Sequence, residues 1–87
     1  MQLTAKLVKA ARGLAGWTSA ELSRSSGVSI DTIRSFESGR NKSLNARNQR
    51  AIVTAFDAAG IAFIPENGGG AGVRLKEKQT GQAGRRR

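Results

Sequence analysis

The stretch LSRSSGVSIDTIRSFESG, residues 22–39, decides the fold of this chain. Its apolar residues stand at helical spacing on both sides of Gly27. Glycine readily adopts the left-handed backbone conformation that turns one helix sharply into the next, and Val28 is placed to fill the corner. In the second helix, Ile33 and Phe36 mark the side that faces a core. The stretch therefore predicts two short helices joined by a sharp turn.

The flanking sequence predicts two further helices and supplies boundary residues for all four. Apolar residues at positions 3, 7, 10 or 11 and 14 predict a helix over 3–14, and those at 52, 56 and 59 predict another over 45–59. TSAE, residues 18–21, has the spacing of a capping box, so the second helix begins there. The predicted N-caps are Thr4, Thr18, Ser29 and Asn45, and the glycines that end the helices are Gly16, Gly27, Gly39 and Gly60.

The sequence changes character after residue 60. IAFI (61–64) and VRLK (73–76) are strand-like runs, and PENGGGAG (65–72) between them is rich in turn-forming residues, which favours a β-hairpin. The final stretch, EKQTGQAGRRR, has one apolar residue in eleven and is predicted to be disordered. The predicted organisation is a helical domain over 1–60, a hairpin over 61–76 and a basic tail over 77–87.

The chain is strongly basic, with 15 Lys and Arg against 6 Asp and Glu and a net charge of +9. Residues 1–76 hold eleven of these cations and five of the anions, for a net charge of +6, and residues 77–87 hold four and one, for +3. The positive charge therefore extends beyond the tail. Such a charge attracts polyanions, and it favours a nucleic-acid partner over a surface that is only solvated.

The missing residue types exclude several functions. There is no Cys and no His, so the sequence offers no thiolate, no imidazole ligand for zinc and no histidine base. Tyr is also missing, and we expect no enzyme, no metal, no cofactor and no small-molecule ligand. The first fifteen residues lack the apolar core of a signal peptide, and no apolar run is long enough to span a membrane. We expect a cytoplasmic protein without membrane contact.

Residues 17–40 resemble the lambda-repressor-like (Cro/CI or XRE) helix-turn-helix family of bacterial and phage DNA-binding regulators, through the pattern W-x4-L-x4-G-V-S-x3-I-x3-E-x-G-R. AAR (10–12) and FESGR (36–40) strengthen the resemblance, which covers residues 8–59. It implies a mainly α fold, a lambda-repressor-like domain of four to five helices with a short C-terminal β-hairpin. It also implies a structural ion pair between Arg12 and Glu37.

Two positions depart from the pattern of that family. Many members carry Gln at the start of the second helix, where it braces the recognition helix, and this chain has Ser19 there. Serine is shorter, so we expect it to reach only a phosphate. The usual small Ala of the same helix is replaced by Ser23, which keeps the small size that two touching helices need.

We expect residues 29–38 to be the recognition helix, which lies in the major groove of double-stranded DNA. Arg34 suits guanine O6 and N7, Asp31 can accept from cytosine N4, and Ile30 can contact a thymine methyl group. Thr32 and Ser35 are permissive hydrogen-bonding groups. Three of the five also have a structural interpretation, in which Ile30 packs inward, Asp31 stabilises the helix dipole and Arg34 is a solvated surface residue.

Polar and basic residues around this helix are expected to contact the DNA backbone. A hydroxyl at the start of the helix suits a phosphate, and the basic residues after the helix would position the protein without reading bases. The Arg85–Arg87 tail adds either salt-sensitive binding or solubility. The predicted phosphate contacts are Ser19, Ser29, Arg40, Asn41, Lys42 and Arg47.

A single recognition helix gives a weak half-site contact, and regulators of this family usually bind near-palindromic sites as dimers. A lone hairpin is marginally stable in water. It is therefore expected either to join two copies of the chain or to pack on the fourth helix of its own chain. The predicted dimerisation residues are Ile61, Phe63, Ile64, Val73 and Leu75.

These observations predict a homodimeric, sequence-specific transcriptional regulator, a repressor at its own or a neighbouring promoter, of the kind that controls mobile elements. An antitoxin that binds a partner toxin as well as DNA is a second hypothesis, because the Gly-rich loop and the tail leave room for another protein. A nonspecific nucleoid-type or RNA-binding protein is a third. It lacks support, since the three Phe and the one Trp are all placed for the core and leave none to stack on bases.

Overall fold

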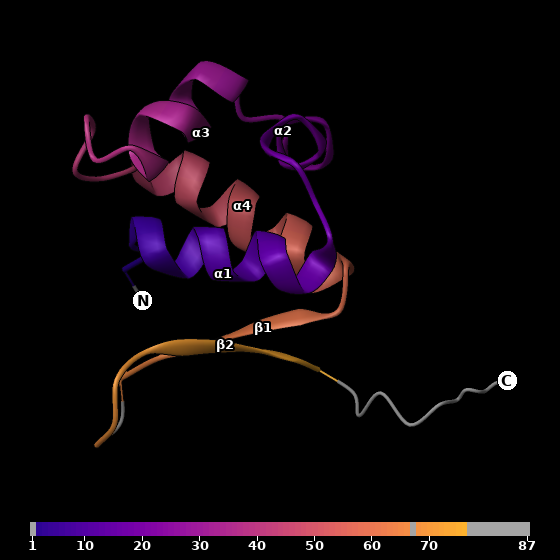
Figure 1. Ribbon diagram of the computed structural model, residues 1–87, viewed down its shortest axis with the longest axis vertical. Coiled ribbons are helices and arrows are strands. Elements are labelled where there is room, and N and C mark those ends of the chain that lie inside the picture. The colour runs from indigo at the N-terminus through magenta and orange to yellow at the C-terminus, as the bar shows by residue number, and fades with distance from the viewer. Residues whose placement is uncertain (1, 67, 77–87) are drawn as a thin grey trace, which may run out of the picture.

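A computed structural model describes residues 2–66 and 68–76 of the chain. It is mainly helical, with four helices followed by a two-stranded antiparallel hairpin (Figure 1). The tail predicted to be disordered, residues 77–87, lies outside the described residues. The elements are α1 (Ala5–Ala15), α2 (Ser19–Ser26), α3 (Ile30–Glu37), α4 (Ala46–Ala58), β1 (Ile61–Ile64) and β2 (Gly72–Leu75).

The helix boundaries follow from local side-chain chemistry. Each predicted N-cap has extended backbone dihedrals and accepts a hydrogen bond from an amide of the first turn, which confirms the four predicted starts. The predicted glycines adopt positive φ angles after the helices, between 72° and 87°. The third and fourth helices end at Glu37 and Ala58, one residue before the predicted ends, because the C-cap residues Ser38 and Ala59 follow there.

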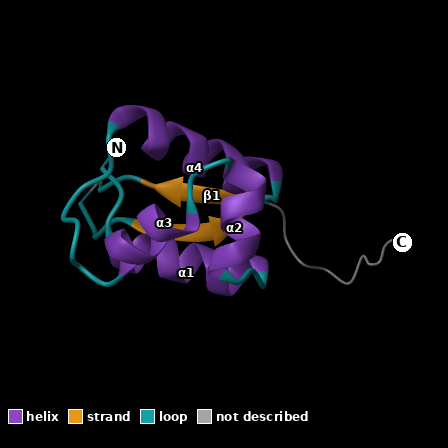
Figure 2. Ribbon diagram, turned by 90° about the horizontal axis from the view of Figure 1, so that it is seen from above, coloured by secondary structure: helices purple, strands orange, loops and turns teal. Residues whose placement is uncertain are grey.

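The molecule has two ends with different elements. α2 and α3 form one end, the hairpin forms the opposite end, and α1 and α4 lie between them (Figure 1). Seen from the end with α2 and α3, α4 lies over β1 at one side of the molecule and α1 lies over β2 at the other (Figure 2). α3 and the hairpin are therefore separated by the layer of α1 and α4 (Figure 1).

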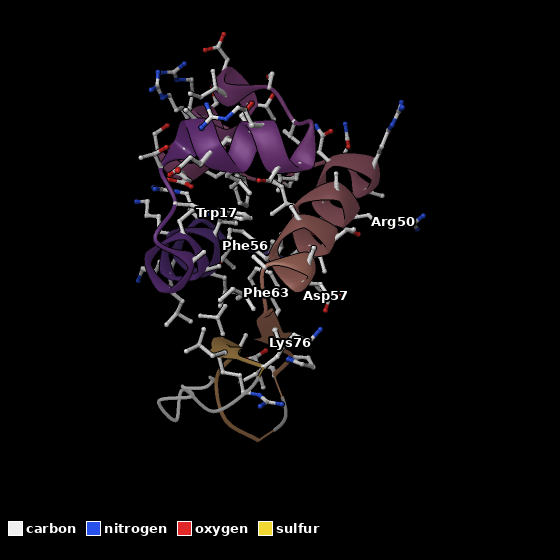
Figure 3. All side chains as sticks on the ribbon, turned by 90° about the vertical axis from the view of Figure 1, so that its right-hand side faces the viewer. Trp17, Arg50, Phe56, Asp57, Phe63 and Lys76 are labelled. Atoms are coloured by element: carbon white, nitrogen blue, oxygen red, sulfur yellow. The ribbon has the colours of Figure 1, made fainter. Side chains whose placement is uncertain are left out.

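Three aromatic rings connect the layers. The ring of Phe56 on α4 is fully buried and stacks on Trp17, with 5.2 Å between ring centroids. Phe63 of β1 meets Phe56 edge-on at 5.7 Å, and the three rings follow one another from the α1–α2 corner to the hairpin (Figure 3). The remaining core residues come from the four helices, from β1, from the segment before α1 and from the turn between α2 and α3: Leu3, Val8, Ala11, Leu22, Val28, Ile33, Phe36, Ile52, Ala55 and Ile61.

The hairpin packs on its own chain. Ile61 pairs with Leu75 and Phe63 with Val73 in the antiparallel register, so these four side chains share one face of the hairpin. Ile61 is only 1% exposed, and the other three are partly buried against the core. Four of the five predicted dimerisation residues thus contact α1 and α4, the alternative that the sequence left open. The fifth predicted residue, Ile64, is 37% exposed, and its side chain points away from the core.

The start of α2 supports a prediction about pH. The Thr18 amide donates to Glu21 Oε1 at 2.7 Å, and Thr18 Oγ1 accepts from the Glu21 amide at 3.1 Å. The hydrogen bond from the Thr18 backbone lowers the pKa of Glu21. A carboxylate whose pKa is lowered by folding stabilises the fold above its ordinary pKa, and this contribution is lost as the pH falls through the lowered pKa.

We therefore expect Glu21→Gln, which removes only the charge, to lower the free energy of unfolding at about pH 7 and to have a smaller effect below about pH 3. Urea denaturation of both proteins at the two pH values measures this difference. An equal difference at both pH values would mean that the charge of Glu21 does not cause it.

Candidate nucleic-acid interface

The turn between α2 and α3 is fixed by short polar contacts. Gly27 adopts a left-handed conformation with φ of 81°, and the next residue, Val28, is 4% exposed in the corner between the helices. Ser23 Oγ donates to the Val28 carbonyl at 2.6 Å, and Ser26 Oγ accepts from the Val28 amide at 3.1 Å. The serine at position 23 therefore adds a hydrogen bond that an alanine there would lack. These hydrogen bonds hold the turn and so fix the angle between the axes of α2 and α3.

α3 has a buried side and an exposed side. Ile33 and Phe36 are 1% and 2% exposed and anchor the helix in the core. Asp31 and Arg34 are exposed on the side away from the core. The remaining predicted base-reading residues, Ile30, Thr32 and Ser35, are all half-buried. Ile30 lies outside the core cluster, so its side chain remains near the exposed side.

The hydroxyl groups at the start of α3 are already hydrogen-bonded to one another. Ser29 Oγ accepts from the Thr32 amide at 3.2 Å and donates to Thr32 Oγ1 at 2.9 Å. The hydrogen of the Ser29 hydroxyl is therefore in use within the helix cap. Within this cap the Thr32 hydroxyl oxygen acts as an acceptor.

The predicted phosphate-contacting residues after α3 lie on an exposed loop and at the start of α4. Arg40, Asn41, Lys42 and Arg47 are all exposed, and Ser19 is half-buried at the first residue of α2. The Asn41 amide donates to the Ser35 carbonyl at 3.0 Å, which holds the loop against the end of α3. None of these cations is in either of the ion pairs found among the described residues, so their charges are available to an anion.

Arg50 is not among the residues predicted from the sequence to contact DNA. This residue lies one turn after Arg47 on α4, and both line a shallow hollow of about 580 Å³ beside Ser25 and Ser26 at the end of α2. The spacing of three residues on one helix was the signal that could have found it. Arg50 projects from the side of the molecule, between its two ends (Figure 3).

Arg12 and Glu37 connect α1 to the end of α3. The Arg12 guanidinium donates to both carboxylate oxygens of Glu37, at 2.7 and 2.9 Å, and also to the Trp17 carbonyl at 3.0 Å. Glu37 is 8% exposed, and its hydrogen bond to the Arg12 guanidinium raises the pKa of Arg12. This arrangement holds the end of α3 in place and leaves neither group free for DNA.

Neither a metal site nor a membrane-spanning helix is found among the described residues. No group of three or more acidic, His or Cys side chains there could hold a metal ion. No helix in the same part of the chain is long and apolar enough to cross a membrane.

The comparison with protein families agrees with this geometry. A family model described as Helix-turn-helix, of the Cro/CI and XRE-like type, matches residues 8–57, from the second turn of α1 almost to the end of α4. A comparison with curated proteins returned no match. The family match covers more than half of the chain and contains the whole α2–turn–α3 unit. The chain therefore belongs to the Cro/CI-type helix-turn-helix family of DNA-binding transcriptional regulators.

Proposed function

We propose that two copies of this protein bind a near-palindromic operator at its own or a neighbouring promoter and repress transcription, with α3 of each copy in the major groove. The observation that carries the proposal is the two-sided structure of α3. One side is anchored in the core by Ile33 and Phe36, and the other presents Arg34 and Asp31 to solvent. A helix held in this way offers side chains to base edges without losing its place in the fold.

The chemistry of the exposed side supports sequence reading. Arg34 has the planar pair of donors that matches guanine O6 and N7, and a good contact of this kind contributes about 1–3 kcal/mol of discrimination. Asp31 is repelled by phosphates, so it is favourable only where a base offers a donor such as cytosine N4. An acidic residue in this position therefore favours particular sequences over DNA in general.

The cations around α3 support affinity. Arg40, Lys42 and Arg47 are exposed close to the end of α3 and the start of α4, where they would contact phosphates beside the groove. Such contacts position the protein and weaken steeply with salt, but they carry no sequence information. Phosphate binding by these residues should therefore depend strongly on salt and little on DNA sequence, whereas base reading by α3 should depend on DNA sequence.

The operator is symmetric in this proposal because one short helix reads few base pairs. α3 has eight residues, and only its exposed side is free to contact bases. Two copies related by a two-fold axis would read two half-sites about 34 Å apart and combine their affinities.

Binding to the DNA just upstream of the protein's own gene, compared with scrambled DNA of equal length, tests the proposal. At about 150 mM salt, where phosphate affinity is reduced, we expect at least about 10³-fold tighter binding to the upstream DNA. Equal binding to both DNAs would instead support a nonspecific nucleoid-type protein. The antitoxin alternative predicts that a second protein purifies with the chain from its native cells.

A further inference from the structure

We propose that the outer side of α4 is the surface through which two copies dimerise, with Arg50 of each copy paired with Asp57 of the other. This inference rests on the proposed function, since it names the interface of that dimer. We call the surface the α4 face and define it by Arg50, Val53, Thr54 and Asp57.

The charges on the α4 face are complementary to themselves. Arg50 and Asp57 are seven residues apart, so they lie on the same side of the helix, about 10 Å apart along its axis. Both side chains project outward from α4 (Figure 3). When two such helices pack antiparallel across a two-fold axis, each Arg50 lies opposite the partner's Asp57. The symmetry therefore places the same ion pair in the interface twice.

Arg50 and Asp57 are both able to make this contact. Neither of the two ion pairs found among residues 2–66 and 68–76 includes Arg50. Asp57 pairs with Lys76 at 3.0 Å, but the two side chains are 63% and 44% exposed. An exposed pair of this kind contributes little, so Asp57 can accept a second cation without losing much.

The surface around Arg50 is shaped to receive another helix. One hollow of about 450 Å³ separates α4 from β1 and is lined in part by Val53 and Phe63. The hollow of about 580 Å³ lies on the other flank of α4, with Thr54 and Ala58 in its wall. Arg50 lines both, so it stands on a ridge between two grooves. Ridges and grooves of this kind interlock when two helices pack.

The position of the α4 face agrees with the requirements of an operator. α4 and β1 occupy one lateral side of the molecule, with α3 at one end and the hairpin at the other (Figures 1 and 2). A two-fold axis beside α4, running from the α3 end to the hairpin end, leaves both copies of α3 facing the same way. Stacking the outer faces of two hairpins would point the two recognition helices in opposite directions, so that arrangement cannot serve one DNA duplex.

Charge reversal tests the interface. Arg50→Glu and Asp57→Arg each place like charges opposite one another twice per dimer, so each should weaken dimerisation by at least about tenfold. The double variant Arg50→Glu/Asp57→Arg restores both pairs with reversed polarity and should dimerise as wild type does. Sedimentation of the full chain without DNA, over a range of concentrations, measures the dimerisation constants of the wild type and the three variants. All the substituted groups are exposed, and circular dichroism verifies that the fold is kept.

Two control variants isolate the contact. Lys76→Gln removes the ion pair between Lys76 and Asp57 within one chain and should leave dimerisation unchanged. Arg74→Glu reverses an exposed charge on the hairpin and should also leave dimerisation unchanged. Single variants that dimerise normally, or a double variant that stays as weak as the singles, would overturn the inference. A wild-type protein that stays monomeric but still selects its operator would overturn the inference and leave sequence-specific repression, the other part of the proposed function, intact. A dimer that is rescued by the double variant but ignores DNA sequence would contradict the proposed function alone.

Discussion

Replacing Arg34 with alanine should weaken binding to the cognate operator by about 5- to 150-fold per half-site and leave binding to scrambled DNA nearly unchanged. The range corresponds to about 1–3 kcal/mol for a bidentate contact with guanine. Arg34 is exposed and belongs to neither ion pair of the described residues, so its loss costs the fold little. Fluorescence anisotropy with operator, scrambled DNA and single-base operator variants measures the effect. At the base pair that Arg34 reads, the variant should discriminate less than wild type.

Arg74→Ala is the matched control for this experiment. It removes the same side chain and the same charge from the exposed face of β2, at the end of the molecule opposite α3 (Figure 1). We expect it to change operator affinity only slightly, through long-range attraction that salt screens. If the two variants weaken operator binding equally, the positive charge as such is responsible. If Arg34→Ala weakens binding to scrambled DNA as much as it weakens binding to the operator, Arg34 contacts a phosphate and reads no base.

The helical part of the fold was predictable because its signals are local. A hydroxyl or amide side chain three residues before an amide, as at Thr4, Ser29 or Asn45, can satisfy that amide only if the helix starts there. A glycine after the last turn, as at Gly27, permits the left-handed residue that ends it. The same locality explains why the two sides of α3 could be assigned from Ile33 and Phe36 alone.

The remaining features depend on contacts between distant residues. The packing of the hairpin on its own helices depends on such contacts, for example the one that Phe56 makes with Phe63 across the core. The Leu3 amide donates to Gln49 Oε1 at 3.1 Å. These residues are 46 positions apart in the sequence, and no periodic pattern predicts their contact. The hydrogen bonds that Ser29 makes in its helix cap could not be predicted in full for a different reason. A cap and a phosphate compete for the same hydroxyl, and a sequence does not show which one receives its hydrogen.

Replacing Phe56 with alanine should be the most damaging single substitution in the described part of the chain. Phe56 is fully buried, and its ring contacts both Trp17 and Phe63. Truncation of such a side chain costs about 3–5 kcal/mol, because apolar burial is lost and a cavity remains. A domain of this size has a total stability of only about 4–13 kcal/mol. The variant should therefore unfold at much lower urea concentration, and operator binding should be lost with the fold.

Two further variants separate the ring contacts from general loss of apolar surface. Leu14→Ala truncates a large apolar side chain that is 43% exposed, and it should cost well under about 1 kcal/mol. Phe56→Leu keeps most of the volume but removes both ring contacts, so its cost should fall between the other two. If Phe56→Ala lowered the free energy of unfolding no more than Leu14→Ala does, the hairpin would not be held to the helices through this ring. The hairpin would then be held to the helices mainly by its other packed side chains, among them Ile61, which is 1% exposed.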